Sequence, residues 1–211
     1  MDHYLDTILT WDKLAKAYQE KFMNMELYNE SYNLFLSHLP KENAEIFEIA
    51  CGPGNITKYL KSKQPDLKIT SSDVSPSMVQ LAKQNNPEVE FITMDCRDLN
   101  KQTNTYDGLM CGFVLPYLAK EDAKLLIQNA NRILKEKGIL YLSAIEGNYE
   151  NSKFETSSDG HYKMHMHYYS EEFLTQLLKE NNFELIKTLY VNYEVPGKEN
   201  STHLILLSRK K

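Results

Sequence analysis

The chain has 211 residues and a formal net charge of −5, with 42% hydrophobic and 25% charged residues. This length suits one α/β domain over residues 1–211, and the lack of any apolar run of 18 residues excludes a membrane-spanning helix. The negative charge argues against nucleic acid as the main partner, because binding to phosphates needs a basic surface.

The cysteines and the first residues indicate the compartment. Cys51, Cys96 and Cys111 show no paired close spacing, so neither a disulfide framework nor a zinc site is indicated, and no metal is expected. Residues 1–11 carry two aspartates and one histidine, and they lack the basic start of a secretory signal. A cytoplasmic location is therefore expected.

Residues 1–40 are predicted to form a helical cover. Leu14, Tyr18 and Phe22 recur at helical spacing, and a second apolar pattern predicts a helix that ends near Pro40. Tyr18 has two interpretations at this point: a ring that closes over a ligand, or a core aromatic on an amphipathic helix.

From residue 44 the pattern alternates between strand and helix. Short apolar strands are expected at 44–51, 67–72, 89–93, 106–113 and 139–144. Helices are expected at 55–63, from Ser75-Pro76 onward, and at 120–137 with Gly138 as the C-cap. This alternation predicts a parallel sheet with helices on both faces.

Residues 148–169 are too long and polar for an ordinary connection, and they predict a hairpin insertion near the substrate side. Asp159-Gly160 is a favoured hairpin turn, and the following residues alternate with strand periodicity: Tyr162, Met164, Met166 and Tyr168 on one face, Lys163, His165 and His167 on the other. The first set is expected to pack inward or to form a substrate wall.

The end of the chain predicts a helix from Ser170 and two closing strands. The strands are expected at 183–193 and 203–208, with a turn through Pro196-Gly197 between them. Strands connected so tightly should be antiparallel. The whole sheet is thus expected to have seven mostly parallel strands and an antiparallel last strand.

Residues 48–54, Glu-Ile-Ala-Cys-Gly-Pro-Gly, follow the first strand and precede a helix. Glycines there let the backbone approach a ligand, and a helix N-terminus favours an anionic group. A dinucleotide-binding fingerprint would have a further glycine where Thr57 stands. A tight strand-to-helix turn without a ligand is the alternative interpretation.

Two acidic residues follow later strands. Asp73 ends the second strand about 20 residues beyond the glycines, the spacing at which an acidic residue meets ribose hydroxyls, and Asp95 follows the third. Each could instead cap the helix or turn that comes after it. An adenosine group across the strand ends would meet all three loops.

Taken together, these segments resemble the class I S-adenosylmethionine-dependent methyltransferases of the small-molecule type. The resemblance covers about residues 11–209 and implies a Rossmann-like methyltransferase fold with S-adenosylmethionine as the cofactor. The N-terminal segment from Trp11 to Tyr18 resembles the leading helix of such enzymes, in which an aromatic closes over the cofactor. The implied cofactor-binding residues are Glu48, Ala50, Cys51, Gly52 and Gly54 for the methionine part, Asp73 for the ribose, Val74 or Met78 for the adenine face, Asp95 and Cys96 for its edge, and Cys111 and Tyr18 near the sulfonium.

The resemblance implies direct displacement of the methyl group to an acceptor O, N, S or C atom. Residues 111–117, Cys-Gly-Phe-Val-Leu-Pro-Tyr, do not match the Asn/Asp-Pro-Pro-aromatic motif of nucleic-acid N-methyltransferases, which favours a small-molecule acceptor. A general base is needed only if the acceptor must lose a proton, so no catalytic residue is assigned; the candidates are His165, His167 and Tyr18. The first interpretation of the two histidines is that they are hairpin surface residues; as ligands of a metal they would lack an evident third ligand.

Two other functions are kept open. A non-catalytic protein could use the same pocket to bind S-adenosylmethionine or S-adenosylhomocysteine. A nicotinamide-dependent oxidoreductase shares the architecture, but Thr57 and the antiparallel closing strands disfavour it. The acceptor, the oligomeric state and the pathway are open from sequence.

Overall fold

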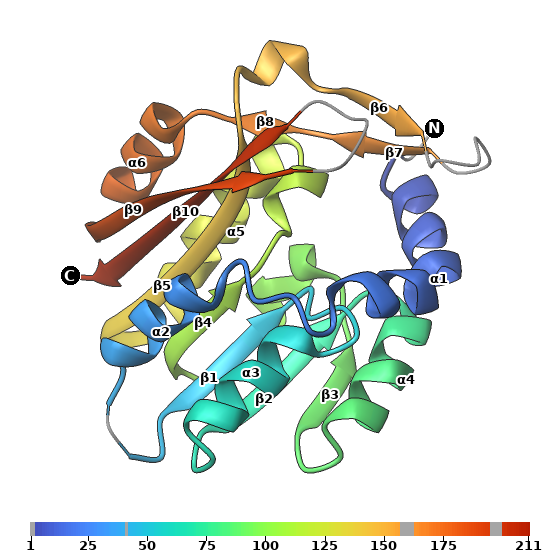
Figure 1. Cartoon of the computed structure of the whole chain (residues 1–211). Helices are drawn as coiled ribbons and strands as arrows, with labels where there is room; N and C mark the ends of the chain where they lie inside the picture. Colours follow the sequence, from blue (N-terminus) through green and yellow to red (C-terminus); the bar gives the residue numbers. More distant parts are fainter. Residues whose placement is uncertain (1–2, 41, 157–162, 195–199) are drawn as a thin grey trace.

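The computed structural model describes residues 3–40, 42–156, 163–194 and 200–211 (Figure 1). Its helices are α1 (His3–Phe22), α2 (Asn29–Ser37), α3 (Asn55–Lys63), α4 (Pro76–Asn85), α5 (Lys120–Ile133) and α6 (Glu171–Glu180), with short 3₁₀ turns η1 (Cys96–Lys101), η2 (Leu115–Tyr117) and η3 (Tyr149–Asn151). Its strands are β1 (Glu45–Ile49), β2 (Lys68–Asp73), β3 (Glu90–Thr93), β4 (Tyr106–Cys111), β5 (Leu134–Glu146), β6 (Lys153–Thr156), β7 (Lys163–Met166), β8 (Tyr168–Tyr169), β9 (Phe183–Tyr193) and β10 (Ser201–Lys210).

The main sheet has the strand order β3-β2-β1-β4-β5-β10-β9, with the two-residue β8 beside the end of β5 as an eighth strand. Strands β1 to β5 are parallel, and β10 is antiparallel to both of its neighbours. The predicted mostly parallel sheet with an antiparallel closing strand is confirmed. The strand order reverses between β1 and β4, and open α/β sheets bind ligands at the carboxyl ends of the strands at such a point.

Helices cover both faces of this sheet (Figure 1). Successive residues of β1 point to opposite faces: Ile46 belongs to the core with Phe35 of α2 and Leu60 of α3, whereas Phe47 belongs to the core with Ile127 of α5. Because a parallel sheet is covered on both faces, its central strands consist almost entirely of buried residues.

Local signals fixed two helix starts as predicted. Ser75 is the N-cap of α4, where its hydroxyl accepts a hydrogen bond from the Met78 backbone N–H at 3.1 Å and Pro76 takes the first helical position. Ser170 caps α6 in the same way, through the Phe173 backbone N–H. Both caps lie at the edge of the sheet where the parallel strands end.

The prediction that a helix runs to residue 137 with Gly138 as its C-cap is wrong. Helix α5 ends at Ile133, because Leu134 enters the sheet beside Tyr106 and begins β5. Lys135 is held there by Glu45 and Asp107, at 2.7 and 3.0 Å. Gly138 lies inside β5, where a Cβ would come within 2.8 Å of the Lys135 carbonyl oxygen. The glycine is therefore needed for a close backbone approach within the strand.

The predicted hairpin insertion is present as the antiparallel pair of β6 and β7. It lies against α1, where the Thr10 hydroxyl donates a hydrogen bond to the Lys163 carbonyl at 3.2 Å. Figure 1 shows the hairpin reaching across the end of the sheet toward α1. Asp159-Gly160 and Tyr162 lie outside the described residues, and so do Pro196-Gly197, for which a turn was predicted.

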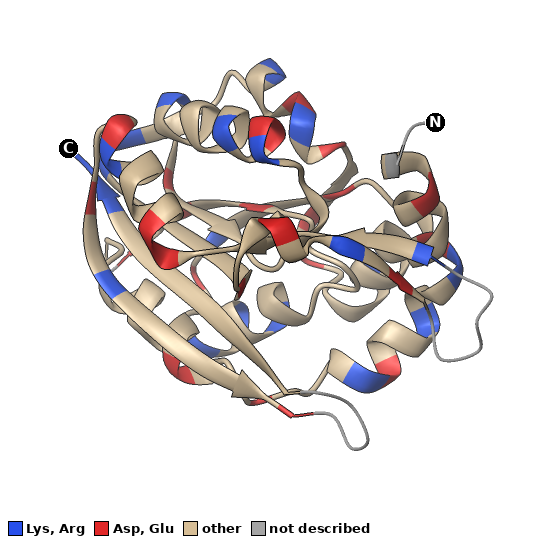
Figure 2. Ribbon diagram, turned by 90° about the horizontal axis from the view of Figure 1, so that it is seen from above, with Lys and Arg blue, Asp and Glu red and all other residues tan. Residues whose placement is uncertain are grey.

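Lys and Arg residues are interspersed with Asp and Glu on the helices (Figure 2). No helix among the described residues combines the length and the apolar character that crossing a membrane requires.

Candidate functional site

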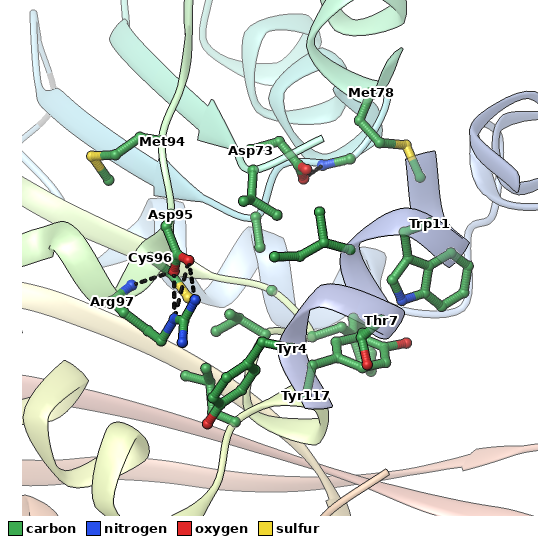
Figure 3. Close-up of a pocket in the computed structure, with 18 of the residues that line it drawn as sticks. Tyr4, Thr7, Trp11, Asp73, Met78, Met94, Asp95, Cys96, Arg97 and Tyr117 are labelled. Atoms are coloured by element: carbon green, nitrogen blue, oxygen red, sulfur yellow. Dashed lines mark hydrogen bonds and ion pairs between the residues drawn. The ribbon is translucent and has the colours of Figure 1, made fainter. Parts of the chain in front are cut away.

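Two adjoining cavities lie at the carboxyl ends of the parallel strands. The first holds about 850 Å³ of empty space, part of it open to solvent, and the loops after β1 to β4 surround it while α1 covers it. Figure 3 shows Trp11 and Thr7 projecting from α1 on one side and Asp95 with Arg97 on the other. Eight of the predicted cofactor-binding residues line this cavity: Tyr18, Ala50, Gly52, Asp73, Val74, Met78, Asp95 and Cys96.

The turn after β1 is built from left-handed backbone. Gly52 and Gly54 have φ angles of 54° and 80°, which glycine adopts without a steric penalty. Ala50 has a φ of 53°, so the alanine that stands where the resembling family usually has glycine occupies a strained position. A Cβ on Gly54 would lie 2.5 Å from Asn86 Nδ2, which shows that this glycine allows α3 and α4 to approach each other rather than lining the cavity.

Asp73 connects two of the loops that form the first cavity. One carboxylate oxygen accepts a hydrogen bond from the Gly52 backbone N–H at 2.8 Å, and the other accepts one from the Ser75 N–H at 2.9 Å. Burial raises the pKa of Asp73, against the lowering effect of these bonds. The structure therefore shows the capping role of Asp73 and places its side chain at the cavity, while binding of ribose hydroxyls stays a prediction.

Glu48 lies beneath the glycine turn and does not line the cavity. Oε2 accepts hydrogen bonds from the Thr57 hydroxyl and from Ser71 Oγ, and Oε1 is buried without a hydrogen-bond partner among the described residues. Burial raises the pKa of Glu48 to about 7, while the bonds from Thr57 and Ser71 act in the opposite direction. Thr57, which replaces the third glycine of a dinucleotide fingerprint, thus serves to hold this carboxyl group.

Asp95 caps η1 and forms an ion pair with Arg97 at 2.6 Å, as Figure 3 shows. Burial acts to raise the pKa of Asp95, but the hydrogen bonds from Arg97 outweigh it and lower the pKa. The guanidinium also lies over the ring of Tyr4, 4.1 Å from its centroid. The Tyr4 hydroxyl in turn donates to Asp122 and accepts from the Ala119 N–H. This chain of contacts fixes the first turns of α1 at the rim of the cavity.

A second set of hydrogen bonds holds helix α1 beside the first cavity. Asp12 accepts hydrogen bonds from Ser75 Oγ at 2.6 Å and from the Ser77 N–H at 2.9 Å. These bonds lower the pKa of Asp12, Ser75 contributing most, and they place a carboxylate at the positive end of α4. The helix is therefore held down along its length.

Tyr18 lies between the two cavities and lines both of them. A Cβ on Gly52 would be 3.5 Å from Tyr18 Cε1, so the ring covers the glycine turn. Trp11 meets it edge-on with ring centroids 5.3 Å apart and also contacts Tyr117 at 5.6 Å. Tyr18 therefore lines the two cavities and is not part of the buried core, and its closing over a ligand stays a prediction.

The second cavity holds about 940 Å³ of empty space, part of it also open to solvent. It shares with the first the residues Trp11, Tyr18, Ala50, Gly112, Phe113 and Tyr117. Its remaining wall comes from the end of α1, the region between α1 and α2, α2, the glycine turn with the start of α3, η2, the ends of β5 and β7, and the adjacent ends of β9 and β10. Cys51 lines this second cavity and not the first. Cys111 is fully buried in the core on the α5 side and lines neither of the two.

His203 on β10 is a member of the second cavity that the sequence did not single out. Its Nδ1 is 2.7 Å from the Tyr28 hydroxyl, and its Nε2 is 3.1 Å from Ser201 Oγ. Burial lowers the pKa of His203 to about 4. No motif marks Tyr28 or His203, because they come from distant parts of the chain. The available signal in the sequence was a histidine at the start of an apolar strand.

His165 and His167 lie outside both cavities. The expectation of two hairpin surface residues is wrong for His167, which is 9% exposed. Its ring stacks on Tyr149, and its backbone N–H donates to the Pro116 carbonyl at 2.7 Å. His165 Nδ1 lies 3.1 Å from His167 Nε2. Within the described residues no group of three or more His, Cys, Asp or Glu side chains is arranged to hold a metal ion.

Comparison with known proteins finds similarity in the central part of the chain. Residues 46–138 match the family model described as a methyltransferase domain. A protein of Invertebrate iridescent virus 6 named as a methyltransferase is 27% identical over 172 residues, which are 80% of this chain and 62% of that protein. The tRNA N(3)-methylcytidine methyltransferase trm141 of Schizosaccharomyces pombe is 27% identical over 160 residues, 71% of this chain and 64% of that protein.

The chain therefore spans less than two thirds of the length of these two curated relatives. Among solved structures, magnesium protoporphyrin IX methyltransferase (ChlM) from Synechocystis PCC 6803 with bound S-adenosylhomocysteine superposes with a TM-score of 0.76. The superposition covers 100% of both chains at 16% sequence identity, a likeness that concerns the fold.

Proposed function

Residues 46–138 carry a methyltransferase domain in a chain with the Rossmann-like fold of the class I methyltransferases, and from this premise we propose that the protein is an S-adenosylmethionine-dependent methyltransferase with a small-molecule acceptor. The proposal treats residues 1–211 as one domain, with residues 1–40 as its cover and residues 148–169 as its insertion. A cytoplasmic location stays a prediction.

The residues around the first cavity fit S-adenosylmethionine. Buried Glu48 Oε1, without a hydrogen-bond partner among the described residues, lies beneath a turn in which Gly52 leaves room for a ligand close to the backbone. In the proposal, the glycine turn holds the methionine part and Glu48 supports this turn from beneath. Asp73 binds the ribose hydroxyls, Val74 or Met78 contacts the adenine face, and Asp95 with Cys96 contacts its edge. When bound, the cofactor supplies a methyl group on a positively charged sulfur, whose bond to carbon breaks as an acceptor lone pair forms the new bond.

The observation that carries the proposal is the wall common to the two cavities. A donor in the first cavity and an acceptor in the second would meet beside Tyr18, Ala50 and Phe113, which line both. The chain's own contribution is alignment of the two molecules and exclusion of water by α1. His165 and His167 lie outside both cavities, so neither is assigned a catalytic role.

A small-molecule acceptor is supported by the aromatic lining of the second cavity and by the charge distribution. Aromatic rings line this cavity, and Figure 2 shows Lys and Arg mixed with Asp and Glu along the helices. The net charge is −5. Binding of a long phosphate-bearing chain such as tRNA would need a basic surface.

The alternatives kept open by the sequence are less well supported. Thr57 is engaged with Glu48 where a nicotinamide dinucleotide site would have glycine, and β10 is antiparallel. A protein that only binds S-adenosylmethionine would have no use for a second cavity that shares six residues with the first.

Calorimetry tests the proposal directly. S-adenosylmethionine and S-adenosylhomocysteine should bind with micromolar dissociation constants (about −8 kcal/mol), and NADH should not bind. Asp73→Ala should weaken binding tenfold or more, whereas Asp66→Ala, at an exposed aspartate between α3 and β2, should leave it unchanged. Failure of a well-folded protein to bind either sulfur compound would overturn the proposal.

A further inference from the structure

We propose that the second cavity receives a flat, uncharged aromatic acceptor that carries a carbonyl oxygen or ring nitrogen, and that His203 orients it by a hydrogen bond. This inference rests on the proposed function, because it gives that cavity the role of the acceptor site. Its support comes from the chemistry of the wall, the fixed position of His203 and the conformation of Phe113.

The wall of the second cavity consists largely of aromatic ring faces, and its described residues carry no charged side chain. Rings line it from several elements, Tyr18, Phe22, Tyr28, Phe113, Tyr117 and Tyr193 among them. None of the described residues that line it is Asp, Glu, Lys or Arg. The Lys21 ammonium group lies over the rings of Phe22 and Tyr193, but Lys21 does not line the cavity. A carboxylate or phosphate would be transferred from water to a site without an opposite charge, which is costly, whereas a planar ring stacks favourably.

His203 is held in one orientation. Its ring is nearly parallel to those of Tyr28 and Tyr193, with centroids 5.9 and 5.0 Å away and interplanar angles of 9° and 19°. The 2.7 Å contact between the Tyr28 hydroxyl and Nδ1 fixes the rotation of the imidazole. A positioned polar group in an otherwise apolar wall is what gives a bound molecule its orientation.

The hydrogen-bonding direction of His203 follows from its partners. Burial keeps the imidazole neutral at pH 7, since its pKa falls to about 4. Burial also raises the pKa of the Tyr28 hydroxyl, which keeps its proton, and we assign this hydroxyl as the hydrogen-bond donor to Nδ1. The imidazole proton then resides on Nε2 and is donated to Ser201 Oγ, 3.1 Å away at the half-exposed start of β10. A bound carbonyl oxygen or ring nitrogen would replace the Ser201 hydroxyl as the acceptor of this hydrogen bond.

Phe113 connects His203 with the junction of the cavities. Its ring is 5.1 Å from that of His203, and it lines both cavities. Its φ of 59° is uncommon for a residue with a bulky side chain, and the Phe113 N–H donates to Ser143 Oγ at 2.6 Å, which holds it there. An acceptor bonded to His203 would thus extend along Phe113 toward the donor.

Binding of defined probes to the full chain tests the inference. 4-Quinolone and acridone are planar, neutral and carry a carbonyl; naphthalene lacks the hydrogen-bonding atom, and 2-naphthoate is an anion of similar shape. With saturating S-adenosylhomocysteine, at least one carbonyl probe should bind tenfold more tightly than 2-naphthoate. His203→Phe should weaken binding of that probe tenfold and leave naphthalene binding unchanged, while His203→Gln, which keeps an N–H donor, should restore part of the affinity. His38→Gln, at a histidine outside both cavities, is the matched control.

Each result decides one of the two proposals. Preferred binding of 2-naphthoate, equal binding of the carbonyl probes to wild type and His203→Phe, or no binding of any planar probe would overturn the inference. In these three cases S-adenosylhomocysteine still binds, and the proposed function stands. If the wild-type protein does not bind S-adenosylhomocysteine, the proposed function itself fails.

Discussion

The carboxylate of Asp73 accepts a hydrogen bond from the Gly52 backbone N–H at 2.8 Å and so joins the end of β2 to the glycine turn after β1. The turn is thereby held open by a residue 21 positions away in sequence. Its shape depends as much on this bond as on the glycines themselves.

The two glycines of the turn should respond differently to substitution. Gly54→Ala is expected to lower the free energy of unfolding by about 2 kcal/mol, because φ is 80° and the new Cβ would meet Asn86 and the backbone of Ala82. Gly52→Ala should cost about 1 kcal/mol of stability but should weaken S-adenosylhomocysteine binding tenfold, since its Cβ would occupy the lined space near Tyr18. Urea denaturation and calorimetry measure the two effects, and the reverse ranking would contradict the assignment of roles.

Glu48 should make stability depend on pH. Its pKa is raised from 4.5 to about 7, so the folded state holds a proton between these values that the unfolded state has released. Stability attributable to this group is then lost as pH rises from about 4.5 to 7, by roughly 3 kcal/mol in total. Without cofactor, the difference in unfolding free energy between wild type and Glu48→Gln should fall over pH 5–8, as measured in urea. Parallel pH profiles would show that Glu48 is already ionised.

His203 should change the pH dependence of stability in the opposite direction to Glu48. Its pKa is lowered from 6.5 to about 4, so below pH 6.5 the unfolded state binds a proton that the folded state does not. Stability should therefore rise with pH between about 4 and 6.5, by roughly 3 kcal/mol, and this rise should be absent in His203→Phe. Unfolding in urea at pH 5 and pH 7 measures it, with His38→Gln as the control. A wild-type slope preserved in His203→Phe would contradict the burial of a neutral imidazole.

Asp12 should control how long the cofactor product stays bound. Asp12→Ala removes the bonds to Ser75 Oγ and the Ser77 N–H that hold α1 over the first cavity. Dissociation of S-adenosylhomocysteine, followed by stopped flow, should become about tenfold faster, with a smaller change in the association rate. Asp6→Ala changes an exposed aspartate of the same helix and should leave both rates unchanged. Equal dissociation rates in both variants would show that α1 is not held by Asp12.

Much of the fold was predictable from local patterns. Helix α3 begins and ends at the predicted residues, and the Ser75-Pro76 start of α4 is a cap whose chemistry is contained in four residues. The end of α5 was not predictable in this way. Residues 134–137 continue a helical composition, but pairing of Leu134 with Tyr106 and the two carboxylates on Lys135 draw them into the sheet.

The candidate site likewise has a part that was predictable from the sequence and a part that was not. Sequence by itself determined the glycine turn, Asp73 and Asp95, because strand, turn and helix cap are short-range features and parallel strands bring their carboxyl ends to one edge. Only the tertiary structure decided that Glu48 and Cys111 lie beneath the cavities, that His165 and His167 stand apart from them, and that α1 closes over the first cavity. It also decided the second cavity, where Tyr28 and His203 meet although 175 residues separate them. A contact of that separation is fixed by the packing of β10 beside β5 and of the α1–α2 region above it, and no local pattern in the sequence records it.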